Sequence, residues 1–536
     1  MSFGFSYIGL IWLLMLLVPN FIWTKNKPVD YEKYAAKENK VLLALERTGE
    51  FIVTPVALFF SDFNYKGWHF WSLVLLASFV CMVLYEIFWI RYFRSEKTMK
   101  DFYRGLIGIP VAGATYPVIA FFLLGIYGGN ILMLLGSIIL GIGHIGIHLD
   151  HHKEVYGPKE KKKLPIRILF GFMKVTAIVI LTVIIGAFVF FIACRNIKQF
   201  RHAIAYKDGV NEQIFVQLND QEEYVSIIGE SADNPVIISL HGGPGSPTTF
   251  IDYCWQDYLT DEYTVISWDE RGCGRSYYRN AGIDPDNATL TFEQQLADLD
   301  ALVDYACGRF GREQVIILGH SYGSMLGSRY ALTHPEKVSA YIGVGQCVNE
   351  RDYYGETYSY EDALKTAKER GDDTAELETA YERFMSDKSI ANLLQLRTLT
   401  DVYHPQTVTK DVSTMAALTS PIAGVDDIRW YMIQMSAMSG GTRYEVLVEK
   451  PLGGYMMDFD ALEHEDAYQM PVLLLSGSCD WICPVGLVEE YADNITAPEV
   501  SVHLMEGCGH SPQGQLPEEF AGKIKDFLAG CYPGNK

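Results

Sequence analysis

The stretch from Gln314 to Gly327 constrains the fold of this chain more than any other. Its apolar, largely β-branched start, Val315–Leu318, predicts a buried parallel strand. Gly-His-Ser-Tyr-Gly follows at 319–323, and the small residues after it predict a helix packed closely on a sheet. Two flanking glycines allow a turn so tight that Ser321 must adopt strained backbone geometry, with its hydroxyl above the sheet. This pattern predicts an α/β domain with Ser321 as nucleophile; the alternative is an ordinary strand-to-helix turn.

Charged and apolar residues are distributed unevenly along the 536 residues. Residues 1–194 contain nearly all the long apolar runs and carry a net charge of +7, whereas residues 195–536 carry −28, which together give the −21 of the chain. The sequence therefore predicts a basic membrane half and an acidic soluble half. Nucleic acid is excluded as a partner, because phosphate binding needs a basic stripe.

Five apolar runs are long enough to cross a bilayer, and a sixth is weaker because Glu46, Arg47 and Glu50 interrupt it. Counting the sixth places the lysine-rich and arginine-rich loops on one side, so the positive-inside rule predicts a multi-pass cell-membrane protein with its soluble half on the extracytoplasmic side. Without it the orientation stays open. The predicted helices span 4–23, 41–60, 68–90, 105–127, 130–148 and 168–193 of a transmembrane region over 1–194.

Histidines recur on one face of the fifth predicted span. His144 and His148 lie four residues apart, and His152 continues the same face. Such residues could hold a metal or relay a proton, but the sequence favours a helix interface because no second set of ligands is visible.

Polar, glycine-bearing loops follow two further predicted strands in the soluble half. His241-Gly-Gly-Pro-Gly follows the strand 236–240, and Asp269-Glu-Arg-Gly-Cys-Gly-Arg-Ser follows the strand 263–268. The glycines of the first loop let backbone N–H groups approach a reaction centre. The N–H groups of Gly243 and Tyr322 are therefore predicted to form an oxyanion hole.

These two loops and the Gly-His-Ser-Tyr-Gly turn, in this order and spacing, resemble the proline iminopeptidase family of α/β-hydrolases. The resemblance extends from about residue 210 to the end of the sequence. It implies an α/β-hydrolase fold, a mostly parallel sheet with helices on both faces and a helical cap, here preceded by an all-α transmembrane bundle. It also implies release of N-terminal residues from peptides.

The order of elements in α/β-hydrolases, Ser then acid then His, completes a triad. After Ser321, the strand 472–477 leads to Asp480, and the strand 500–505 leads to His510. His510 would deprotonate Ser321, and Asp480 would fix the imidazole tautomer. Both residues follow the C-terminal ends of predicted parallel strands, at the edge of the sheet where Ser321 emerges.

The predicted cap supplies the candidate substrate-binding residues. In the resembled family, cap carboxylates bind the free amine of the substrate; here Glu350 and Glu356 are available, and Trp430 is the only tryptophan between 347 and 468. The predicted organisation is a transmembrane region at 1–194, a neck at 195–211, a first core segment at 212–346, the cap at 347–468 and a second core segment at 469–536.

The sequence favours a membrane-anchored serine hydrolase, an aminopeptidase that acts through an acyl-enzyme. One alternative is a carboxylesterase or lipase-like enzyme acting on esters, and another is a non-catalytic membrane sensor with a vestigial hydrolase domain. The predicted partners are a small peptide or ester substrate and the lipid bilayer. The ten cysteines are scattered and predicted to be isolated thiols, with no metal and no cofactor.

Overall fold

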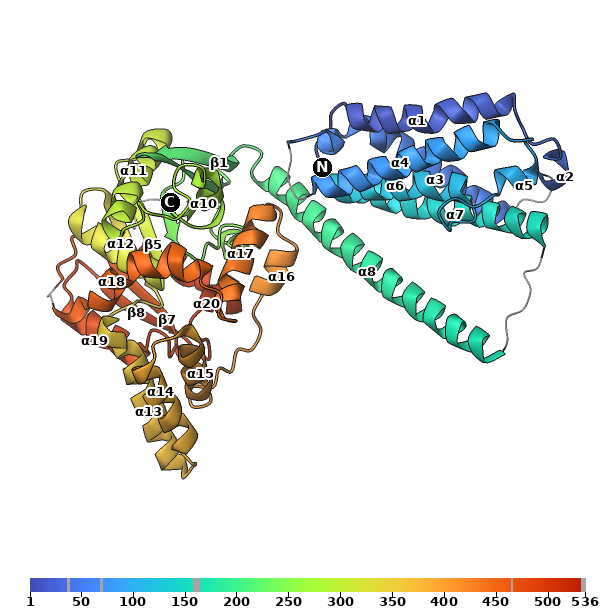
Figure 1. The fold of residues 1–536 in the computed structure, drawn as a ribbon. Helices are drawn as coiled ribbons and strands as arrows, with labels where there is room; N and C mark the ends of the chain where they lie inside the picture. The colour runs from blue at the N-terminus through green and yellow to red at the C-terminus, as the bar shows by residue number, and fades with distance from the viewer. Residues whose placement is uncertain (36–38, 68–70, 158–163, 464–465, 532–536) are drawn as a thin grey trace. The chain divides into compact units, whose positions relative to one another are not determined.

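The computed structural model describes residues 1–35, 39–67, 71–157, 164–463 and 466–531, without the side chains of 34–35 and 164–184. It divides into two compact units, Met1–Phe200 and Arg201–Lys536 (Figure 1). The first unit is helical and the second contains one large sheet. The structure therefore separates the chain where the sequence changes from apolar to acidic.

Three helices in the described part of the N-terminal unit are long and apolar enough to cross a membrane: α1, α4 and α7. The apolar helix α6 is shorter. The predicted span 168–193 lies entirely within α8, whose side chains up to residue 184 are not described. Helix α8 continues through the first part of the predicted neck. The helices are α1 (Tyr7–Thr24), α2 (Glu32–Ala35), α3 (Lys40–Phe59), η1 (Ser61–Phe63), α4 (Ser72–Phe93), α5 (Met99–Phe102), α6 (Ala112–Gly128), α7 (Ile131–Tyr156) and α8 (Leu164–Ala205).

Helices α3 and α7 cross at very short range. A side-chain carbon at Gly143 of α7 would lie 2.3 Å from the backbone nitrogen of Glu46 on α3, so only glycine permits this approach. The same crossing brings the Glu46 carboxylate onto Nδ1 of His144. Glu46, one of the charged residues that made the span at 41–60 a weaker prediction, thus has a partner, His144, on a neighbouring helix.

The C-terminal unit is built on an eight-stranded sheet with the order β1-β2-β4-β3-β5-β6-β7-β8. The hairpin β1–β2 joins the sheet antiparallel to β4, and all remaining pairs are parallel. The strands are β1 (Val210–Leu218), β2 (Gln221–Gly229), β3 (Val236–Leu240), β4 (Thr264–Asp269), β5 (Val315–His320), β6 (Val338–Val344), β7 (Val472–Gly477) and β8 (Val500–Met505). The helices around it are α9 (Tyr253–Gln256), α10 (Gly274–Asn280), α11 (Phe292–Phe310), α12 (Tyr322–Thr333), α19 (Val485–Asn494), α20 (Pro512–Gln515) and α21 (Pro517–Cys531).

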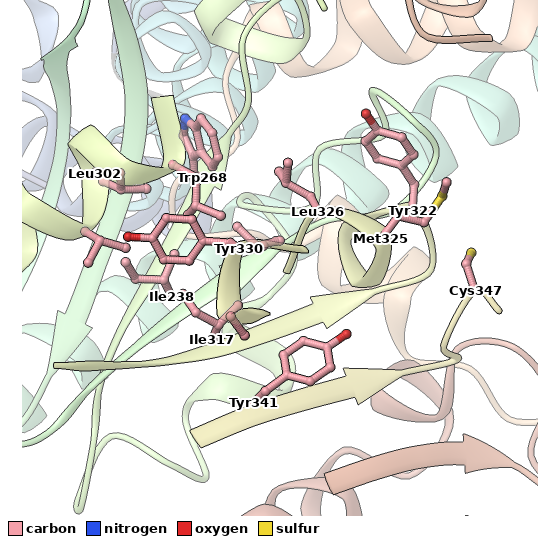
Figure 2. Packing of buried hydrophobic residues seen from close by; sticks show 14 of the residues in the cluster. Ile238, Trp268, Leu302, Ile317, Tyr322, Met325, Leu326, Tyr330, Tyr341 and Cys347 are labelled. Carbon is pink, nitrogen blue, oxygen red and sulfur yellow. The ribbon is translucent and has the colours of Figure 1, made fainter. Parts of the chain in front are cut away.

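Alternate residues of the central strands belong to separate apolar cores on the two faces of the sheet. Ile238 and Ile317 pack in one cluster with residues of α11 and α12, whereas Ile237 and Ile316 pack in another with residues of α21. Figure 2 shows Tyr330 of α12 in the first cluster, near the strands that carry Ile238 and Ile317. Because both faces are covered, these strands read as continuous apolar runs in the sequence.

A helical insertion of more than a hundred residues separates β6 from β7, within the predicted cap range 347–468. It consists of η2 (Arg351–Tyr353), α13 (Tyr354–Arg370), α14 (Ala375–Ser386), α15 (Ile390–Asp401), α16 (Ser413–Leu418), α17 (Val425–Ala437), η3 (Glu445–Glu449), α18 (Lys450–Asp458) and η4 (Ala461–Glu463). Helix α17 is bound to α10, the helix after the β4 loop, because Arg275 of α10 forms a two-point ion pair with Asp427.

A buried ionic network fixes the loop after β4 to the sheet and to α11. The Arg271 guanidinium, 1% exposed, donates to Asp298 at 2.5 and 3.0 Å and to Asp220 at 2.6 Å. Glu223 of β2 lies 3.8 Å from the same group and accepts a hydrogen bond from Trp268 at 2.8 Å. Asp298 is fully buried, so its charge depends on Arg271, whereas burial and the neighbouring Asp298 raise the pKa of Glu223 well above its ordinary value.

We predict that Arg271→Met destabilises the C-terminal unit by about 3–5 kcal/mol, because Asp298 would remain buried without its cation. Arg279→Met is the matched control, since its ion pair with Glu222 is about half exposed and contributes less than about 1 kcal/mol. Urea unfolding of the full-length protein, followed by tryptophan fluorescence, measures both. Equal losses of unfolding free energy in the two variants would contradict the role of Arg271 as the cation of this buried network.

Candidate active site

Ser321 lies at the turn between β5 and α12, in a backbone conformation that is rare for a residue with a side chain. Its φ is 53° and its ψ −123°. The following helix approaches β3 so closely that a side-chain carbon at Gly323 would lie 2.5 Å from the Leu240 carbonyl oxygen. The strained turn predicted from the sequence is therefore present, and strain of this kind, about 1–3 kcal/mol per residue, clusters at functional sites.

His510 and Asp480 are held together by loops that follow two other strands. Nδ1 of His510 lies 2.8 Å from Oδ2 of Asp480. The other carboxylate oxygen accepts the N–H groups of Ile482 at 2.9 Å and Cys483 at 3.0 Å. Asp480 is 5% exposed, and both of its oxygens are occupied. This arrangement fixes the ring of His510 with Nδ1 toward the acid, as a serine triad requires.

Ser321 and His510 line one cavity of about 270 Å³. Gly243 and Tyr322, the predicted oxyanion donors, line it too. Tyr322 is the first residue of α12, so its N–H is one of the helix's initial groups that have no acceptor within the helix. The remaining lining residues come from four segments: the loop after β3, the turn that carries Ser321 (the elbow) with the start of α12, the cap, and the loop of Asp480. They are Gly242, Ser246, Thr248, His320, Met325, Cys347, Glu350, Arg397, Met456, Ile482 and Cys483.

His320, the residue before Ser321, supports the loop of His510. Nε2 of His320 lies 2.9 Å from the backbone carbonyl of His510, so the ring donates from this nitrogen and supports the histidine loop. Burial, together with the nearby His510, lowers the pKa of His320 to about 4. His320 is therefore a neutral positioning residue at physiological pH.

Buried polar groups support the predicted oxyanion loop and the elbow. Nδ1 of His241 lies 2.9 Å from the Gly242 carbonyl, and burial lowers the pKa of His241 to about 4. Gln295 joins the loop after β4 to the elbow, because it donates to Glu270 at 3.0 Å and accepts from the Tyr322 hydroxyl at 2.5 Å. Burial raises the pKa of Glu270 well above its ordinary value.

The two candidate carboxylates of the cap have different surroundings. Glu356 is 7% exposed and accepts two hydrogen bonds from Arg397, a residue of α15 that the sequence analysis missed. Glu350 lines the cavity with Ser321. Burial and the neighbouring Glu356 raise the pKa of Glu350 to about 7, although Arg397 partly offsets them. Of these two carboxylates, Glu350 lines the cavity and is not bound by Arg397, whereas Glu356 is bound by Arg397 and does not line the cavity.

Trp430 does not line the cavity where it was expected to contact substrate. Its indole is 1% exposed, packs on Tyr277 and donates from Nε1 to the Gly245 carbonyl at 2.8 Å. A buried indole N–H requires such an acceptor, and here the acceptor belongs to the loop that carries Gly243. Trp430 therefore positions that loop, a contact that its place in the sequence could not reveal.

A family model described as the alpha/beta hydrolase fold matches residues 235–515, just over half of the sequence. The chain belongs to the α/β-hydrolase fold family. The predicted fold class is confirmed, with an all-α unit before it whose three long apolar helices could form a transmembrane bundle.

Proteins similar to this α/β-hydrolase include aminopeptidases. A probable aminopeptidase, YbaC, of Bacillus subtilis is 23% identical over 313 residues, which cover 58% of this chain and 93% of the relative. The proline iminopeptidase of Lactobacillus delbrueckii subsp. bulgaricus is 24% identical over 326 residues, 59% of this chain and 96% of its own. The predicted resemblance to proline iminopeptidases is confirmed, and the family supports a hydrolase.

Solved structures also align with this chain. The proline iminopeptidase of Mycobacterium smegmatis aligns with a TM-score of 0.43 and 21% identity over 61% of this chain and all of that one. A bacterial membrane phospholipase A aligns with a TM-score of 0.42 and 20% identity over 68% of this chain and 98% of that one.

We predict that Trp430→Phe lowers the turnover of a p-nitrophenyl ester about tenfold. Loss of the hydrogen bond to Gly245 loosens the loop that carries Gly243. The expected decrease is smaller than the roughly 10²–10³-fold loss of kcat that follows removal of an oxyanion donor. Tyr431→Phe, an exposed neighbour on the same helix, serves as control and keeps wild-type turnover. If both variants matched the wild type, the positioning role would be wrong.

Proposed function

We propose that the protein is a membrane-anchored serine hydrolase that releases N-terminal residues from short peptides. The observation that carries the proposal is one cavity lined by strained Ser321, by His510 in contact with Asp480, and by the carboxylate of Glu350. The apolar helices support the anchor, and the loop charges support an extracytoplasmic hydrolase domain.

In this mechanism Oγ of Ser321 attacks the first peptide carbonyl of the substrate while Nε2 of His510 accepts its proton. Asp480 stabilises the imidazolium that forms. The N–H groups of Gly243 and Tyr322 bind the developing oxyanion. The imidazolium then protonates the leaving amine, and water attacks the acyl-enzyme by the same route.

Glu350 is the residue that would select peptide substrates with a free N-terminus. A protonated α-amine in the cavity would be attracted by this carboxylate, whereas Arg397 neutralises Glu356. Ester hydrolysis is the second candidate, favoured by Met325, Met456 and Ile482 in the cavity wall. These side chains suit an apolar acyl group.

We predict that Ser321→Ala reduces the hydrolysis of aminoacyl-naphthylamides, prolyl-naphthylamide among them, by at least about 10³-fold. Ser328→Ala, which removes a hydroxyl from α12, the helix that follows Ser321, serves as the control and retains turnover. Short-chain p-nitrophenyl esters are assayed in parallel. Ester cleavage with no amide cleavage would favour the esterase, and unchanged turnover in Ser321→Ala would contradict a serine nucleophile.

We predict that KM for aminoacyl-naphthylamides falls as pH rises through about 7, because Glu350 loses its proton there and gains the charge that attracts the substrate amine. At higher pH the α-amine itself loses its proton, with a pKa of about 8, and KM rises again. Dividing by the pH profile of KM for a neutral ester, which carries no amine, removes the pH effects that are common to both substrates. Glu350→Gln raises KM and abolishes the fall near pH 7; persistence of that fall in the variant would exclude Glu350.

A further inference from the structure

Two cysteines mark the places where the chain leaves the core for the cap and returns. Cys347 follows β6, and Cys483 follows β7 on the loop of Asp480, yet their sulfur atoms lie only 3.5 Å apart. Their exposed fractions are 6% and 3%, and both line the cavity that contains Ser321. The two thiols therefore form a buried pair with access from the catalytic cavity.

Glu350 completes a group of three donors. Its carboxylate and the two sulfur atoms all lie within 4.8 Å of one another. Zinc binds thiolates at about 2.3 Å in tetrahedral geometry, which separates two sulfur ligands by about 3.8 Å. The observed separation of 3.5 Å is close to this value. Three protein ligands would leave the fourth position of the ion open.

The charges around the donors are mostly negative. Asp480 accepts the N–H of Cys483 at 3.0 Å, so a second carboxylate lies beside the pair. The guanidinium of Arg397 also lines the cavity, but Glu356 pairs with it. A divalent cation between the thiolates would offset this negative charge.

We propose that Cys347, Cys483 and Glu350 form a site for a thiophilic divalent cation, Zn²⁺, in the wall of the catalytic cavity. Binding displaces the two thiol protons to solvent and involves no oxidation. The ion then inhibits the enzyme, because it occupies the carboxylate that attracts the substrate amine. This inhibition rests on the proposed function, whereas the site does not.

Cobalt is the probe for the site, because its tetrahedral thiolate complexes absorb in the near ultraviolet and the visible. The full-length protein in detergent is reduced and titrated with Co²⁺ alone. We expect a thiolate-to-cobalt charge-transfer band that Zn²⁺ abolishes. Cys347→Ser and Cys483→Ser lose the band, whereas Cys479→Ser, a thiol on the same loop that does not line the cavity, retains it. Circular dichroism verifies that each variant is folded.

A second measurement needs no variant. Zn²⁺ is expected to protect Cys347 and Cys483 from alkylation, as judged by peptide mapping, and to raise KM for aminoacyl-naphthylamides reversibly with chelator. Absence of the cobalt band in the reduced wild type would overturn the site, as would a band unchanged in both serine variants. A cobalt–thiolate band in a protein that hydrolyses no substrate supports the site and contradicts the proposed function.

Discussion

The catalytic arrangement depends on the close backbone contact between the start of α12 and the end of β3. At Gly323 there is no room for a side chain against the Leu240 carbonyl, and this approach leaves Ser321 with φ at 53°. Strain of about 1–3 kcal/mol persists only where the surroundings over-determine the conformation. Here β5 is central in the sheet and buried on both faces, so the turn cannot relax without disrupting two apolar cores.

The polar groups beneath the elbow extend this constraint to the neighbouring loops. Gln295 links Glu270 to Tyr322, and Arg275 of α10, the helix that follows the loop of Glu270, links that helix to Asp427 of the cap. Buried polar groups are costly to leave unpaired, so losing one member of these contacts exposes the desolvation cost of the others. The core and the cap are therefore coupled through the loop after β4, close to the cavity.

The sequence predicted the features that depend on residues adjacent in the chain. A strand, a turn with fixed glycines and a helix are adjacent in the chain, and they placed Ser321. The order of elements in α/β-hydrolases, Ser then acid then His, placed Asp480 and His510 at the same edge of the sheet. Contacts within the cap and between the cap and the core could not be predicted. Arg397 on Glu356, Trp430 on Gly245 and the Cys347–Cys483 pair join residues 41 to 185 positions apart. The partner of Glu46, His144, is 98 residues away, which is why that charge only weakened the predicted span.

Charge bears on the choice between a peptide and a lipid as substrate. Residues 195–536 carry a net charge of −28, so the long-range field of the catalytic half attracts cations and repels anions. Under the proposed function, a peptide with a free α-amine would gain from this field and then from Glu350 within the cavity, so the two effects would act in the same direction. An anionic lipid surface would be repelled by the same charge. Electrostatics therefore supports the proposed amine-bearing substrates over membrane lipids.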